Sequence, residues 1–200
     1  MSKDRLDAFT DGVLAIIITI MVLELKVPHS VGLAALAPLV PIFLVYALSF
    51  LMVAIYWNNH HHLLHAVDHV TGGTLWANMH LLFWLSLFPF VMGWMGENHY
   101  APVPVAAFGV VLLLAAIAYF IFTRVLLASH GPESLLARAV ATNAGKMKVS
   151  MALYAAAIPL AFVHPALALA IYVGVALWWL VPERRIERMV VAHEHEHPAR

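Results

Sequence analysis

The amino-acid sequence predicts an all-α, polytopic membrane protein with six transmembrane helices. Of its 200 residues, 63% are apolar and only 11% are charged, whereas an average soluble domain carries about 25% charged residues. The mean hydropathy is +0.86, and apolar residues are spread over the whole length, so a globule of this size has too little interior to bury them. The main partner of the chain is therefore expected to be the lipid bilayer.

Prolines set the ends of the first two predicted helices. The first, 6–27, stops where Pro28 interrupts the chain, because proline lacks a backbone N–H and ends a helix. The second, 35–57, is opened by Pro38 and Pro41 and lies in an uncharged run long enough for one span.

The remaining four helices follow from three long uncharged runs. The third and fourth helices, 74–95 and 103–127, each occupy one run of about the length that a span requires. Pro165 divides the last run into two short helices, 146–163 and 165–181. The chain is thus predicted to be one six-span domain over residues 1–200. It ends in a polar tail with alternating His and Glu at 185–200.

Charge predicts the orientation and excludes several classes of protein. All Lys and Arg residues except Lys26 fall on one side of the predicted spans, so both termini are expected in the cytoplasm. Lys plus Arg and Asp plus Glu both number 11, which leaves no basic surface for nucleic acid. The absence of cysteine excludes disulfides, thiol nucleophiles and thiolate metal sites.

The first helix carries the most informative residues. The uncharged stretch after Asp11 is too short to cross a bilayer alone, so Asp11 is expected inside the bundle or at its inner mouth, where an ionisable group is a candidate functional site. The alternative is an acid near a helix N-terminus that complements the helix dipole.

A second feature of the first helix is a stripe of four residues spaced i, i+3, i+4 and i+7 on one face, which by periodicity alone is a packing stripe. Its members are Ile16, Thr19, Ile20 and Leu23. In a single chain, the Thr19 hydroxyl is expected to bond the Ala15 carbonyl one turn back.

The start of this helix resembles a known family. Arg5, Phe9, Thr10 and Asp11 are similar to the Arg-x-x-x-Phe-Ser-Asp signature that opens the first helix of the lysosomal potassium channel family, also called the transmembrane protein 175 family. Thr10 stands where serine is usual and keeps the hydroxyl. Weaker similarity continues in the runs Tyr-Trp-Asn-Asn-His-His at 56–61 and Leu-Phe-Pro-Phe at 87–90.

The resemblance implies a potassium-permeable cation channel. It implies a homotetramer in a bacterial inner membrane, with K+ as the permeant ion, no cofactor and no enzymatic activity. The first helix of each subunit would line the pore with rings of apolar side chains; Ile16 would form the narrowest ring, with Thr19, Ile20 and Leu23 beyond it. The chain contains no Thr-Val-Gly-Tyr-Gly loop, so a carbonyl filter of that kind is excluded.

The signature residues are expected to hold the inner end of the first helix. In the resemblance, Arg5, Phe9, Thr10 and Asp11 tie this end to neighbouring helices through hydrogen bonds and a charge pair. His80 and Trp84 of the third helix are expected to hydrogen-bond this region, as polar residues do between packed membrane helices.

A cluster of histidines supports a different class of function. If the second helix continued, His61, His65 and His69 would share one face, with His60 and Asp68 beside them; this is a spacing used to bind zinc or iron. A membrane metalloenzyme is therefore one alternative, and an interfacial extension of the helix is the plainer interpretation. A secondary transporter is disfavoured because the sequence shows no inverted repeat.

Overall fold

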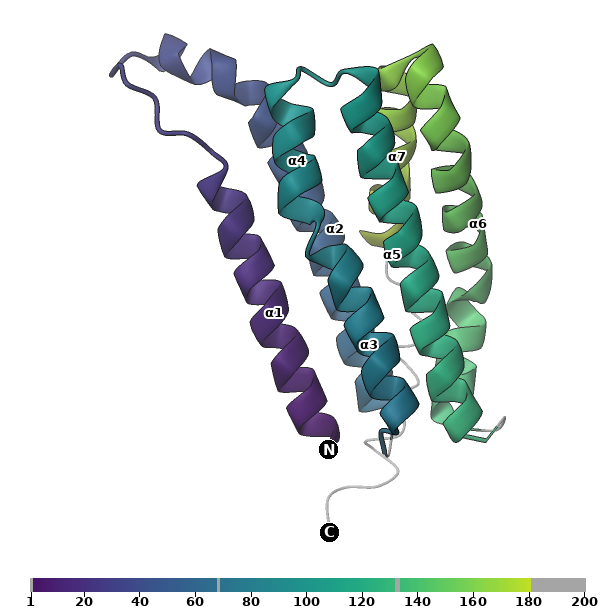
Figure 1. Cartoon of the computed structure of the whole chain (residues 1–200). Helices are drawn as coiled ribbons and strands as arrows, with labels where there is room; N and C mark the ends of the chain where they lie inside the picture. The colour runs from purple at the N-terminus through teal and green to yellow at the C-terminus, as the bar shows by residue number, and fades with distance from the viewer. Residues whose placement is uncertain (1, 68, 132–133, 181–200) are drawn as a thin grey trace.

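The protein is an all-helical bundle in a computed structural model that describes residues 2–67, 69–131 and 134–180. These residues contain seven α-helices and one 3-10 helix, whose arrangement is drawn in Figure 1. The tail predicted at 185–200 lies outside them. The helices are α1 (Lys3–Leu23), η1 (Leu33–Leu39), α2 (Val40–His65), α3 (Gly72–Leu85), α4 (Phe88–Glu97), α5 (Pro102–Ser129), α6 (Leu135–Val163) and α7 (Pro165–Leu180).

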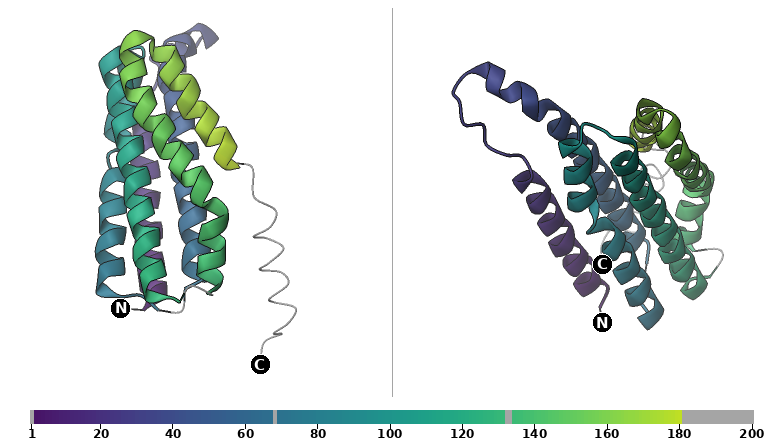
Figure 2. Two further views of the ribbon diagram at one scale, coloured as in Figure 1. Left: turned by 90° about the vertical axis from the view of Figure 1, so that its right-hand side faces the viewer. Right: turned by 45° about the horizontal axis from the view of Figure 1, so that its top comes forward.

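The described residues contain six apolar helical stretches, in agreement with the six helices that the sequence predicts. Five stretches are long and apolar enough to cross a bilayer, and α7 is a shorter apolar helix of 16 residues. Figure 2 shows that α7 runs back from the tight turn after α6 and ends part-way along the bundle. The five long stretches are Lys3–Leu23, Leu33–His65, Gly72–Glu97, Pro102–Ser129 and Leu136–Val163.

The second span differs from the prediction at both ends. Its first seven residues form the 3-10 helix η1, which contains Pro38. The α-helical part begins only at Val40, with Pro41 in its first turn, where a missing N–H costs nothing. At the other end, α2 continues past residue 57 to His65, so the plainer interpretation of a helical extension is correct as far as His65.

The third span is broken in the middle. α3 ends at Leu85 and α4 begins at Phe88, in place of the single helix predicted at 74–95. Pro89 lies in the first turn of α4, where its missing N–H and its ring end the preceding helix. Ser86 closes the last turn of α3 by donating its hydroxyl proton to the Phe83 carbonyl at 2.7 Å.

The fifth span is longer than predicted. α6 starts at Leu135 instead of residue 146, and its N-cap Ser134 accepts a hydrogen bond from the Ala137 amide. This cap satisfies one of the amides that a helix start leaves without a partner.

Helix α5 forms the centre of the bundle, and α1 lies at its edge. α5 contacts α3, α4, α6 and α7, whereas the main contacts of α1 are with α2, α3 and α4. Figure 1 shows α1 at one side of the molecule, with α6 at the other. Within the described residues, one long side of α1 is therefore left exposed.

Candidate functional site

Helix α1 has one buried and one exposed face. The buried face packs on the bundle through residues three or four apart: Leu6, Thr10, Leu14, Ile17 and Met21. The opposite face carries the stripe singled out from the sequence, with Ile16 59% and Leu23 78% exposed, and Thr19 and Ile20 between them also exposed. Within one chain this stripe is therefore not a packing stripe.

Thr19 uses its hydroxyl within the helix. Its Oγ1 donates to the Ile16 carbonyl at 2.8 Å, three residues back, and not to Ala15 as expected. The hydroxyl proton is thereby occupied, but the oxygen keeps lone pairs on the exposed face of α1, where they can accept a hydrogen bond or face a cation.

Asp11 is held from the second span. The Trp57 indole Nε1–H donates to Asp11 Oδ1 at 2.8 Å, and both residues are exposed on the surface of the single chain. A hydrogen bond to a charged acceptor is stronger than one between neutral groups. The partner of Asp11 thus lies on another helix.

A buried chain of hydrogen bonds joins α1, α3 and α2 behind this contact. Thr10 Oγ1 donates to the Leu6 carbonyl at 3.0 Å and accepts from Asn78 Nδ2 at 2.9 Å. The other end of the amide, Asn78 Oδ1, lies 2.9 Å from His60 Nε2. Because the oxygen can only accept, His60 Nε2 is the donor, and in the neutral ring this leaves a lone pair on Nδ1. The side chains of Thr10, Asn78 and His60 are almost fully buried, so water does not reach these hydrogen bonds.

Asp7 lies beside the same cluster. Its two carboxylate oxygens are 3.9 Å from His60 Nδ1 and 3.8 Å from His61 Nδ1. His61 in turn stacks on Trp57 with ring centroids 5.6 Å apart. The N-terminal half of α1 is therefore in contact with α2 through Asp7, Thr10 and Asp11, directly or through Asn78.

In the part of the chain that the structure describes, the other predicted tethering residues form no hydrogen bond or ion pair between α1 and another helix. His80 is exposed, and its Nε2 accepts from Trp84 Nε1 at 2.9 Å on the same helix. Phe9 is 49% exposed. Arg5 is exposed as well, and the described part of the chain contains no ion pair with it.

The described histidines are not gathered as the alternative metal site requires. α2 ends at His65, so His69 leaves the face shared by His61 and His65 and stacks on His130, with ring centroids 4.6 Å apart. Among the residues that the structure describes, no three His, Asp or Glu side chains come together to hold a metal ion. Asp68 lies outside these residues.

The segment that follows α1 is held to α4. Lys26 forms an exposed ion pair with Glu97. The Glu97 carboxylate, which accepts a hydrogen bond from the Lys26 ammonium and attracts its charge, raises the pKa of Lys26 above its ordinary value. The Glu24 carboxylate lies against Gly93, where a Cβ would come within 3.0 Å of Glu24 Oε2. Gly93 thus leaves room for this side chain.

Comparison with known proteins places this geometry in a family. Residues 5–89 match the family described as endosomal/lysosomal potassium channel TMEM175. A potassium channel of Chryseobacterium sp. (strain P1-3) is 50% identical over 188 residues, which cover 94% of this chain and 97% of that protein. The chain belongs to the TMEM175 family of potassium channels.

Two further similarities agree with this assignment. A potassium channel of Streptomyces collinus is 31% identical over 123 residues, or 58% of the TMEM175 chain described here and 60% of its relative. The crystal structure of a lysosomal potassium-selective channel TMEM175 homologue from Chamaesiphon minutus has a TM-score of 0.77 and 28% sequence identity, and the match covers 90% of this chain and 96% of that one.

Membership in the TMEM175 family confirms the predicted family and the predicted class of function. The protein is a potassium channel that spans a membrane, and its relatives are channels and not enzymes. The metalloenzyme and secondary-transporter alternatives are therefore set aside.

The sequence analysis of this TMEM175 channel did not single out Asn78, the central residue of the buried hydrogen bonds that join Thr10 to His60. A signal was present: Asn78 follows Thr74 by four residues and precedes Leu81 and Leu85 at helical spacing, and all four are buried. A polar residue on the buried stripe of a membrane helix indicates a partner on another helix. His80, two residues later, lies on the opposite side of α3.

Proposed function

We propose that four copies of this chain enclose a potassium-permeable pore lined by α1. The observation that carries the proposal is the exposed face of α1, on which Ile16, Thr19, Ile20 and Leu23 all lie. One helix cannot enclose a path for ions, so the proposal requires an oligomer around an axis next to this face.

The composition of the face suits a water-filled path better than lipid. Asp11 and Thr19 lie among its exposed residues, and a carboxylate facing hydrocarbon is costly, whereas one facing a water-filled cavity is not. Asp11 precedes Ile16 by five residues, or about 7.5 Å along the helix. In the proposed pore it attracts cations to the inner mouth.

Ile16 is proposed as the narrowest point. A ring of isoleucine side chains closes a pore by excluding water, and a small rotation of the helices that widens the ring lets a hydrated cation pass. Thr19 and Leu23, one and two turns farther out, extend the lining. Conduction of this kind needs no cofactor.

The test is cation flux into liposomes that contain the purified protein. We expect Ile16→Asn to raise K+ flux several-fold and to lower the preference for K+ over Na+, because an amide ring stays hydrated where an isoleucine ring excludes water. The matched control is Ile121→Asn, since Ile121 is also exposed but lies on α5, away from α1. Equal effects of the two substitutions, or no effect of Ile16→Asn, contradict the proposed constriction.

The oligomer and the orientation are tested separately. The mass of the protein in lipid nanodiscs is expected to correspond to four chains, and a monomer there contradicts the shared pore. Both termini are proposed to face the cytoplasm of a bacterial inner membrane. Because the chain has no cysteine, Ser2→Cys and Ser30→Cys provide single labelling sites. An impermeant thiol reagent is expected to label only the second from outside the cell.

A further inference from the structure

The connection between α1 and α2 extends beyond the bundle without a buried residue. It comprises residues 27–39, which include η1, and every one of them is at least partly exposed. Its largest apolar side chains are almost bare: Val27 is 81%, Val31 109% and Leu33 88% exposed. The connection carries no charged residue. A contiguous exposed apolar surface of this kind marks a place that another molecule covers.

Both ends of the connection are held to the rest of the chain. Lys26, which precedes it, forms the ion pair with Glu97 of α4. At the other end, the Tyr100 hydroxyl donates to the Pro41 carbonyl at 2.7 Å. Tyr100 and the preceding His99 have a left-handed backbone, with φ of 60° and 48°, which is unfavourable for residues with a side chain. The fold therefore fixes where the connection lies, and its exposed surface is part of the design of the chain.

The anchors also give the level of the connection in the bilayer. The Lys26–Glu97 pair is charged and exposed, so it lies outside the hydrocarbon. Helix α2 follows the connection and has 26 residues, or about 39 Å, which exceeds the roughly 30 Å of a bilayer core. The connection is therefore not needed to cross the hydrocarbon and lies at its edge, beside water.

The connection lies on the open side of α1. Figure 1 shows it extending past the end of α1, on the side away from α5 and α6, and the tilted view in Figure 2 agrees. The exposed face of α1 reaches the same place, because Val22 and Leu23 in its last turn are 43% and 78% exposed. One apolar surface thus continues from α1 onto the connection.

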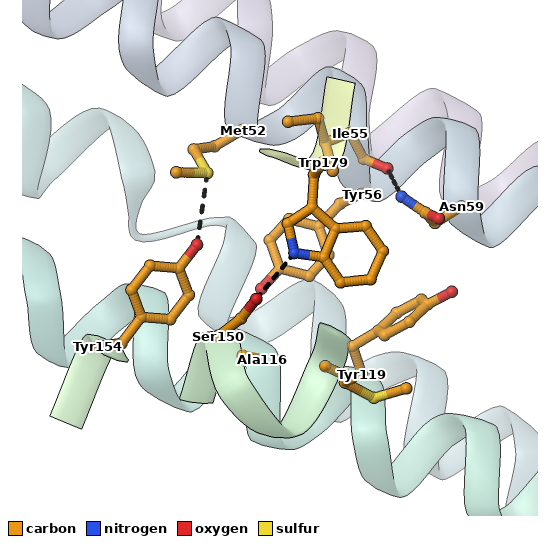
Figure 3. A pocket seen from close by; sticks show the side chains of 10 residues that line it. Met52, Ile55, Tyr56, Asn59, Ala116, Tyr119, Ser150, Tyr154 and Trp179 are labelled. Atoms are coloured by element: carbon orange, nitrogen blue, oxygen red, sulfur yellow. Dashed lines mark hydrogen bonds between the residues drawn. The ribbon is translucent and has the colours of Figure 1, made fainter. Parts of the chain in front are cut away.

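The opposite side of the bundle is closed by contacts within the chain. Side chains of α2, α5, α6 and α7 meet there around a small cavity, which Figure 3 shows. Trp179 Nε1 of α7 donates to Ser150 Oγ of α6 at 2.9 Å, and the Tyr154 hydroxyl donates to Met52 Sδ of α2 at 3.8 Å. Leu167 of α7 is exposed on the outside. This side presents an apolar exterior to lipid, whereas the exposed face of α1 also carries polar residues.

We propose that the α1–α2 connection of each copy packs on a second copy of this chain, at the C-terminal end of its α1, where Val22 and Leu23 are exposed. The inference rests on the proposed function, because the pore requires a neighbour on the open side of α1. Lipid does not occupy that side when ions pass along it, so protein covers the apolar connection. Around a four-fold axis, a contact between two different surfaces closes into a ring. The ring surrounds one mouth of the pore.

The test uses the absence of cysteine from the chain. Val31→Cys is labelled with a benzophenone maleimide, and the full chain is irradiated in liposomes. Denaturing gels are expected to show linked chains, and peptide mass spectrometry is expected to place the adduct within residues 19–39 of the second copy. Leu167→Cys is the matched control, since Leu167 is also exposed but lies on α7. Its probe is expected to react with lipid only.

A third probe separates this proposal from the proposed pore. Ile16→Cys, on the exposed face of α1, is expected to link chains whether or not the connection touches a second copy. Linked chains from Ile16→Cys together with a Val31→Cys probe that reacts only with lipid overturn the ring and leave the pore standing. An adduct of the Val31→Cys probe on another part of the second copy overturns the ring as well. The absence of linked chains from both variants contradicts the pore and the ring together.

Ion flux gives a second readout at the same position. Thiol reagents of opposite charge are applied to both sides of liposomes that contain Val31→Cys. A cationic group is expected to lower K+ flux about two- to threefold and an anionic group to raise it, because charge near a pore mouth changes the local concentration of cations. His164→Cys, exposed in the turn between α6 and α7, is expected to respond to neither reagent. An equal response at both positions, or none at Val31→Cys, overturns the ring around the mouth.

Discussion

Asp7 Oδ1 and His60 Nδ1 face each other across 3.9 Å between α1 and α2, and neither atom has a hydrogen-bond partner. Asn78 Oδ1 accepts from His60 Nε2, so a neutral His60 ring carries its lone pair on Nδ1. A lone pair on the ring and a carboxylate oxygen are thus buried opposite each other. Two buried acceptors without a donor are unfavourable.

This contact predicts that Asp7→Asn stabilises the protein. An amide Nδ2–H at this position can donate to His60 Nδ1, which converts the repulsive contact into a hydrogen bond worth about 1 kcal/mol. The apparent melting temperature in detergent is expected to rise. The matched control is Asp4→Asn, because Asp4 is exposed in the first turn of the same helix and loses the same charge. A decrease with Asp7→Asn, or an equal increase with Asp4→Asn, contradicts the prediction.

The hydrogen bond from Trp57 to Asp11 predicts a loss of assembly without a change in selectivity. Trp57→Phe keeps an aromatic ring but removes the donor to a charged acceptor, which costs about 1.5–3 kcal/mol. Asp11→Ala is expected to reduce folded, assembled protein at least as much. In both variants the assembled fraction keeps its preference for K+ over Na+.

Assembly is measured by size-exclusion chromatography and selectivity by liposome flux. Trp76→Phe is the control, since the Trp76 indole is 79% exposed on α3. Normal assembly with altered ion preference in the Asp11 or Trp57 variant would show that this contact acts on permeation.

Two glycines are expected to respond in opposite directions to alanine. A Cβ on Gly96 would come within 2.8 Å of the Ile42 Cα; because backbone cannot step aside, Gly96→Ala is expected to cost about 1–3 kcal/mol. A Cβ on Gly174 in α7 meets nothing within 4 Å, so Gly174→Ala is expected to gain about 0.5–1 kcal/mol through helix propensity. Thermal unfolding of the two variants checks the pair, and equal shifts would refute the close approach of α4 to α2.

The Lys26–Glu97 ion pair predicts a pH-dependent contribution to stability. The pKa of Lys26 is raised in the folded chain, so the pair stabilises below the ordinary pKa of lysine and the effect is lost as the pH rises through the raised value. The difference in melting temperature between the unmodified chain and Lys26→Met is therefore constant near neutral pH and vanishes in strong base. It is expected to be small and to shrink in high salt, because the pair is exposed. A difference that persists after lysine has lost its proton would have another origin.

Hydropathy and proline positions were sufficient to predict the six membrane helices, but not where several of them end. α2 and α6 continue through Asn59, His60 and Arg138, because helix geometry tolerates polar residues where a span leaves the hydrocarbon. Pro89 breaks the third span, although it stands in an apolar run without other signs of a boundary.

The candidate site was predictable in part. The spacing of Ile16, Thr19, Ile20 and Leu23 places them on one face, but periodicity alone does not distinguish a face that packs from one that stays open. The decision depends on which helices adjoin α1, and this is a property of the whole bundle. The pairing of Asn78 with His60 and Thr10 likewise requires the relative rotation of three helices, which one sequence does not contain.

The division of α1 into two faces has a consequence for how such a chain diversifies. The buried face packs α1 onto the rest of the bundle through Leu6, Leu14, Ile17 and Met21. The residues between them form the exposed face, which is available to contact water, ions or another subunit. The same 21 residues thus contain one set of positions that stabilises the fold and another that forms the exposed face. Substitutions in one set are expected to have little effect on the other. A library randomised at Ile16, Thr19 and Leu23 would thus sample many different open faces on one constant scaffold.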